Sequence, residues 1–127
     1  MNEISILSLA HVGDAVYELL VRSYLVRHGQ SRVVDLHRAT VAMVKAPAQA
    51  RAAAALLPAL TEEEHAVYRR GRNSHVNNVP RGASKAEYHA ATGLEAVFGY
   101  LYLSGRRERI DELFKLVLGC LAQPGED

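Results

Sequence analysis

Asp14 is an acidic residue whose neighbours in the sequence are hard to explain by packing alone. It lies in the stretch LAHVGDAVYELLVRSY, residues 9–24, where apolar residues recur at the three- and four-residue steps of one helix face. Gly13 precedes it, and both glycine and aspartate are unfavourable in a helix interior. Glu18 lies one turn later and Ala10 one turn earlier, so the two acids share a strip of surface. The pattern predicts a helix that carries Asp14 for a chemical reason.

Glu95 repeats this pattern in a second predicted helix. It follows Gly93 and lies within the apolar sequence GLEAVFGYLYL. Lone carboxylates are rarely buried without a partner, so each acid is expected to pair with Arg or Lys, to remain exposed, or to hold a divalent cation. Mg²⁺ prefers carboxylate oxygens and keeps several waters, which one Asp and one Glu would satisfy. On the residues alone these three possibilities stay open.

A basic stretch without any acid lies between the two acidic segments. The chain as a whole has 15 Lys and Arg against 14 Asp and Glu, a formal net charge of +1. Residues 69–85 nevertheless contain five basic residues: Arg69, Arg70, Arg72, Arg81 and Lys85. This local excess favours a polyanionic partner, whose phosphates or 2′-hydroxyls Asn73 could also bind. The alternative is that some of these arginines only solvate a helix end.

The elements that must position these residues are predicted to be helices. Apolar periodicity and capping residues predict helices over about 5–28, 31–45, 47–58, 62–70, 85–105 and 108–121. Pro47 suits a first helical turn, Thr61 suits an N-cap, and Gly71 is expected to end the fourth helix. Residues 71–85 are rich in Gly and Asn and are expected to be irregular. A length of 127 residues with 49% hydrophobic residues predicts one packed domain. The helical periodicity and the lack of any clean strand alternation predict that this domain is all-α.

Several other kinds of site and location are disfavoured by the composition. The six histidines form no i,i+4 pair with a third ligand, which argues against zinc, although His75 in the basic stretch could contact phosphate. A lone Cys120 among apolar residues is expected to be packed, and it fits a reducing, cytoplasmic location. We expect no secretory leader and no membrane span, since no apolar run approaches about 18 residues.

Two motifs resemble those of the ribonuclease III catalytic domain. The sequence GDAVYELLV resembles the first motif of that family, and ATGLEAVFGYLYLSG resembles the second. The segment YRRGRNSHVNNVPRGASKAEY stands where the family has its Gly- and Arg-rich connection. The small size, RGRN and EYHAATGLEA resemble one branch in particular, the Mini-III ribonucleases, which consist of the catalytic domain alone.

The resemblance implies an all-helical homodimer that cleaves double-stranded RNA with Mg²⁺ and leaves 5′-phosphomonoesters. Residues 1–127 would form one catalytic domain with no separate double-stranded RNA-binding domain. Asp14 and Glu95 match the acidic Mg²⁺ ligands of the two motifs, and the Mini-III branch implies maturation of the large-subunit ribosomal RNA precursor. The basic residues and Asn73 would contact the duplex, which is read mainly through its shape, backbone and 2′-hydroxyls.

The chain also departs from the larger ribonuclease III enzymes. They carry a glutamate four residues before the aspartate, where this chain has Ala10, and an aspartate three residues before the glutamate, where it has Thr92. Both differences reduce the negative charge at the expected site. Glu18 is a candidate to contribute through water, with a salt bridge as its alternative role. Tyr88 and Tyr102 share a helix side with Glu95 and are candidate supporting residues, or simply core.

Two alternatives to an enzyme remain at this stage. A catalytically silent RNA-binding or ribosome-assembly protein on the same fold is compatible with the loss of two acids, but retention of Asp14 and Glu95 argues against it. A helical protein-interaction module would explain the amphipathic helices. It would leave the two acid–glycine motifs and the basic stretch unexplained.

Overall fold

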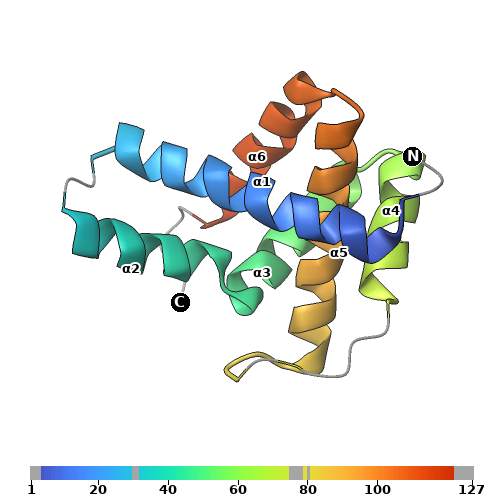
Figure 1. Ribbon diagram of the computed structural model, residues 1–127, viewed down its shortest axis with the longest axis horizontal. Helices are drawn as coiled ribbons and strands as arrows, with labels where there is room; N and C mark the ends of the chain where they lie inside the picture. Colours follow the sequence, from blue (N-terminus) through green and yellow to red (C-terminus); the bar gives the residue numbers. More distant parts are fainter. Residues whose placement is uncertain (1–3, 30–31, 75–78, 80, 122–127) are drawn as a thin grey trace.

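The chain folds into a bundle of helices, shown in Figure 1. The computed structural model describes residues 4–29, 32–74, 79 and 81–121, and within these ranges the regular structure is entirely helical. The helices are α1 (Ile6–Arg27), α2 (Val33–Val44), α3 (Ala46–Leu56), η1 (Leu57–Ala59), α4 (Glu62–Arg72), α5 (Lys85–Leu103) and α6 (Arg107–Leu121). None of these helices is long and apolar enough to cross a membrane.

Side-chain caps fix where several helices begin. The Ser5 hydroxyl accepts a hydrogen bond from the Ser8 backbone at 3.1 Å and starts α1. Thr61 and Ser84 each form a complete capping box, the first with Glu64 and the second with Glu87. Pro47, as predicted, falls in the first turn of α3, where its missing N–H has no intrahelical partner to lose. The predicted helix boundaries therefore hold to within a few residues at these ends.

α5 lies at the centre of the bundle, and α1 crosses it (Figure 1). Tyr17 of α1 packs edge-on against Phe98 of α5, with ring centroids 5.4 Å apart, and against Phe114 of α6 at 6.2 Å. All three rings are buried, and aromatic pairs favour this edge-to-face geometry. The aromatic contacts join three helices that are far apart in the sequence into one core.

Two glycines allow α1 and α5 to touch through their backbones. A Cβ atom at Gly13 would overlap the carbonyl oxygen of Glu95 and lie 2.8 Å from the Gly99 nitrogen. A Cβ atom at Gly99 would in turn overlap the carbonyl oxygen of Leu9. The glycine beside Asp14 is therefore required by the close crossing of two helices, which offsets its poor helix propensity.

A third glycine was misassigned from the sequence. Gly71 was expected to end the fourth helix, but α4 continues through it to Arg72. A Cβ atom at Gly71 would lie 2.9 Å from the Cα atom of Gly93, so this glycine permits close packing of α4 on α5. In consequence Arg69, Arg70 and Arg72 lie in the last helical turn of α4, where cations are favoured by the helix dipole.

The close crossing predicts a large difference between two glycine substitutions. Gly13→Ala should lower the free energy of unfolding by about 3 kcal/mol or more, because the added methyl overlaps backbone atoms that cannot rotate away. Gly119→Ala in α6 has open space and should raise stability by about 0.5–1 kcal/mol. Urea unfolding followed by circular dichroism measures both. Wild-type stability in Gly13→Ala would show that the helices do not cross this closely.

Candidate active site

The helix crossing brings Asp14 and Glu95 together. Gly13 contacts the backbone of Glu95, so the next residue, Asp14, projects its side chain beside the Glu95 carboxyl group. Asp14 is exposed, whereas Glu95 is half-buried. The two acids that the sequence placed on separate helices therefore form one pair at the surface end of a buried crossing.

The pKa of Glu95 is raised in this pair. Burial, and then the negative charge of Asp14, raise the pKa of the Glu95 carboxyl from its ordinary value of 4.5 to about 7. Gln49 opposes this rise by donating a hydrogen bond to the carboxylate. Because the folded pKa is the higher one, the protonated acid favours the fold; this contribution is complete below pH 4.5 and is lost as the pH rises through about 7.

Gln49 is a site residue that the sequence analysis missed. Its Nε2 atom donates to Glu95 Oε2 at 3.1 Å and to the Val44 carbonyl oxygen at 2.8 Å. The signal was present, because Gln49 is a polar residue on the buried side of an otherwise Ala-rich helix. Nothing in the spacing, however, indicates which helix that side faces.

A cavity of about 510 Å³ opens next to Glu95. Thr92 and Tyr88 line it on α5, and Lys45 and Arg81 bring positive charge to it. The Thr92 hydroxyl donates to the Tyr88 carbonyl oxygen at 3.1 Å, so it is bonded within its own helix. The cavity is therefore lined by both charge signs, with Lys45 and Arg81 as the basic residues and Glu95 as the acid.

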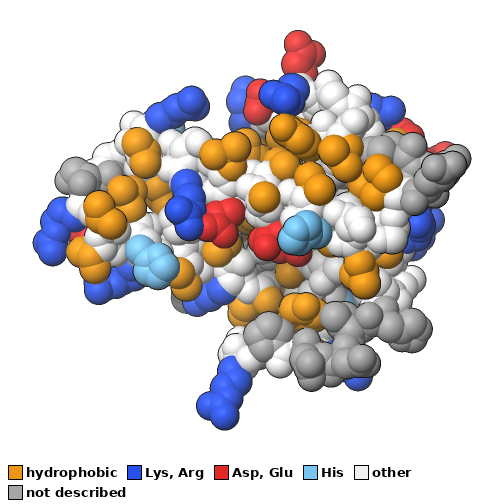
Figure 2. Space-filling view, viewed as in Figure 1, with side chains coloured by type: hydrophobic (Ala, Val, Ile, Leu, Met, Phe, Trp, Pro, Cys, Tyr) orange, Lys and Arg blue, Asp and Glu red, His pale blue; other side chains and the backbone are white. Residues whose placement is uncertain are grey.

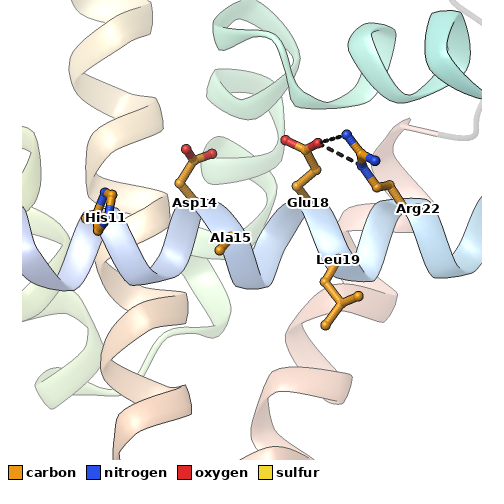
Figure 3. A pocket seen from close by; sticks show the side chains of 6 residues that line it. All are labelled: His11, Asp14, Ala15, Glu18, Leu19 and Arg22. Atoms are coloured by element: carbon orange, nitrogen blue, oxygen red, sulfur yellow. Dashed lines mark hydrogen bonds and ion pairs between the residues drawn. The ribbon is translucent and has the colours of Figure 1, made fainter.

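Two other candidates from the sequence, Glu18 and Tyr102, contact arginine side chains. Glu18 accepts a hydrogen bond from Arg22 Nε at 2.7 Å, and Figure 3 shows this pair beside Asp14 on one side of α1. Tyr102 is exposed, and the guanidinium carbon of Arg107 lies 4.9 Å from the centre of the Tyr102 ring. The salt bridge considered for Glu18 is therefore present, with Arg22 as its partner. Tyr102, which was considered as a support for Glu95, contacts Arg107.

The predicted RNA-contacting residues are available on the surface. Their side chains are all exposed: Arg69, Arg70, Arg72, Asn73 and Lys85. Arg72 Nε donates to Asn73 Oδ1 at 3.3 Å, and its guanidinium lies over the Tyr68 ring at 5.9 Å. His75, considered as a phosphate contact, lies outside the described residues.

Comparison with known proteins identifies the family. The model of the ribonuclease III domain matches residues 7–106. The Mini-ribonuclease 3 of Symbiobacterium thermophilum is 50% identical over 86% of this chain and 84% of that protein. The chain belongs to the ribonuclease III family. The Mini-ribonuclease 3 of Clostridium tetani is 38% identical over 100% of this chain and 85% of that protein. The crystal structure of a Fusobacterium nucleatum protein is 32% identical, with a TM-score of 0.85 over 92% of this chain and 93% of that one.

These similarities make the protein an endoribonuclease of the Mini-ribonuclease 3 type. They confirm the resemblance drawn from the two motifs and from RGRN, and the single ribonuclease III fold. Enzymes of the ribonuclease III family generally depend on a divalent metal.

The chemistry of the donor set fits a hard divalent cation. Asp14 and Glu95 present carboxylate oxygens side by side, and Gln49 Oε1 is buried with no hydrogen-bond partner among the described residues. Those residues bring together no cluster of three or more His, Cys, Asp and Glu side chains. Two carboxylates with room for water suit Mg²⁺, which keeps several of its waters.

Proposed function

We propose that this ribonuclease III protein is a cytoplasmic, Mg²⁺-dependent enzyme that cleaves double-stranded RNA. The observation that carries the proposal is the pair of adjacent carboxylates, Asp14 and Glu95: burial, and then the negative charge of Asp14, raise the pKa of Glu95 to about 7. Like charges are brought together at the expense of stability where a function requires them. A bound cation would remove the repulsion between the two carboxylates. The same cation would stabilise the negative charge of an RNA phosphate at the site of reaction.

Asp14 and Glu95 are the residues that would hold Mg²⁺. A bound Mg²⁺ ion supplies Lewis acidity to a phosphodiester and acidifies water, so hydrolysis needs no nucleophilic side chain. Asp14, being exposed, faces the substrate side, while Glu95 closes the inner side of the site. The product expected from this hydrolysis is a 5′-phosphomonoester with a 3′-hydroxyl.

The basic surface beside α4 and α5 would bind the RNA backbone. Arg69, Arg70 and Arg72 lie on the last turn of α4, and Lys85 begins α5, so all four flank the segment between these helices. Asn73 adds a neutral donor and acceptor for a 2′-hydroxyl or phosphate. Arg81 extends the positive charge into the cavity beside Glu95.

We further propose that the enzyme works as a homodimer on ribosomal RNA precursors of the large subunit. Support for a dimer comes from large apolar side chains left exposed on α1, α5 and α6, among them Leu19, Leu103 and Leu116. Figure 2 shows apolar side chains gathered beside the acidic ones on the face where α1 lies. Two copies would double the surface offered to a duplex. The ribosomal substrate rests on the Mini-III resemblance.

Cleavage of a labelled RNA duplex tests the proposal. Asp14→Asn and Glu95→Gln should each lower the rate in Mg²⁺ by about 100-fold or more, because even residues that only orient metal ligands are worth 10–100-fold. EDTA should abolish cleavage by the wild-type protein. Asp111→Asn and Glu108→Gln, on exposed positions of α6, are the matched controls and should cleave normally. Full activity in Asp14→Asn, or duplex binding without any Mg²⁺-dependent cutting, would contradict the proposal.

Arg72→Ala tests the RNA-binding surface. Loss of one phosphate contact should weaken duplex binding and reduce the slope of log K against log salt by about one. Fluorescence anisotropy at several salt concentrations, with Ca²⁺ in place of Mg²⁺, measures the slope without cleavage. Arg27→Ala, an exposed arginine at the far end of α1, serves as control. An unchanged slope in Arg72→Ala removes this residue from the phosphate contacts.

A further inference from the structure

Gln49 contacts the proposed catalytic acid from inside the protein. It lies in the first turns of α3, and only 3% of its surface is exposed. Its neighbours on the buried side of α3 are apolar: Ala48, Ala52, Ala53 and Leu56. A buried amide costs free energy unless its hydrogen bonds are made, and an apolar residue would fill this position without that cost. An amide at this position is therefore explained by its polar contacts and not by packing.

The hydrogen bonds of Gln49 determine which way its amide points. Nε2 donates to the Val44 carbonyl oxygen at 2.8 Å and to Glu95 Oε2 at 3.1 Å. Both partners accept, so the nitrogen must face them, since a rotated amide would set its oxygen against two oxygens. Val44 is the last residue of α2, where carbonyl groups lack intrahelical partners. The end of α2 thus orients the amide, and the amide orients one oxygen of Glu95.

A second buried glutamate shows what a purely structural arrangement looks like in this protein. Glu64 is 1% exposed, and both of its carboxylate oxygens accept hydrogen bonds from Arg109 at 2.8 Å. That pairing lowers the pKa of Glu64 and cancels its charge. Among the described residues, Glu95 has a neutral amide donor instead of a cation. A neutral donor fixes the direction of a carboxylate and leaves its charge uncompensated.

We infer that Gln49 is a positioning residue that holds the Glu95 carboxylate beside Asp14 while keeping it free to bind a cation. This inference rests on the proposed function, since it requires Glu95 to be a ligand. Gln49 Oε1 is buried, has no partner among the described residues, and belongs to a residue that lines the cavity beside Glu95. Gln49 Oε1 could therefore accept a hydrogen bond from a water molecule or from a substrate group that enters the cavity.

Gln49→Met tests the inference because methionine has nearly the same shape but cannot donate a hydrogen bond. The variant should keep the wild-type melting temperature or exceed it. Its affinity for Mn²⁺, measured by electron paramagnetic resonance of the free ion, should fall about 10–100-fold. Its kcat on an RNA duplex should fall in the same range, with KM unchanged, since the RNA-binding surface is intact. Thr40→Val, which removes a buried polar group from α2, is the control and should bind Mn²⁺ normally.

The outcomes separate the inference from the function on which it rests. If Gln49→Met folds and binds Mn²⁺ as the wild type does, while Asp14→Asn and Glu95→Gln lose binding, only the role of Gln49 is wrong. If all three variants bind Mn²⁺ normally, the proposed site is wrong as well.

If Gln49→Met fails to fold, nitrogen-15 NMR of the wild-type protein tests the role of Gln49 instead. The side-chain amide protons of Gln49 should exchange slowly and shift when Mg²⁺ is added. Rapid exchange without a shift would overturn the inference.

Discussion

The backbone contact between α1 and α5 is the constraint on which both the core and the site depend. Gly13 and Gly99 lie where a methyl group on either would overlap the other helix. Below the crossing, Tyr17 and Phe98 pack together as part of the core. Beside the crossing, the carboxyl groups of Asp14 and Glu95 lie close enough for the charge of Asp14 to raise the pKa of Glu95. The same close approach therefore joins two helices of the core and brings the two acids together.

The surroundings of the proposed catalytic acid, Glu95, differ from those of a structural one, Glu64. Glu64 is more buried than Glu95, yet its pKa is lowered because Arg109 binds both carboxylate oxygens. Among the residues that the structure describes, Glu95 has no such cationic partner, and its pKa is raised by burial and by Asp14. A Lys or Arg side chain paired with Glu95 would stabilise the fold because it would compensate the carboxylate charge. It would also occupy the place of a metal ion. The protein instead retains a neutral contact from Gln49.

Much of the fold was predictable because its signals are local. Apolar periodicity located the helices, and the Thr61 cap and Pro47 are decided within a few residues of sequence. Gly71 was assigned wrongly for the same reason: a glycine that ends a helix and one that admits a neighbouring helix look alike in sequence. Only the long-range packing of α4 on α5 distinguishes them.

The candidate site was predictable in its parts but not in its arrangement. Asp14 and Glu95 stood out because each is an acid beside a glycine in an apolar helix, and the family resemblance joined them. Gln49 carries no local mark that would connect it to Glu95, 46 positions away along the chain. Its role appears only once α3 is packed against α5. Apolar periodicity predicts which side of a helix is buried, but it does not predict which other helix packs against that side.

Ala10 and Thr92, about one helical turn before Asp14 and Glu95 respectively, carry no charge, so the proposed site rests on these two acids. The most direct measurement is the titration of the Glu95 side-chain carboxyl by carbon-13 NMR, with and without Mg²⁺. We predict a pKa near 7 for Glu95 in the metal-free protein and a pKa more than one pH unit lower when Mg²⁺ is present, because a cation favours the ionised acid. A pKa near 4.5 without metal, or one that Mg²⁺ leaves unchanged, would contradict it.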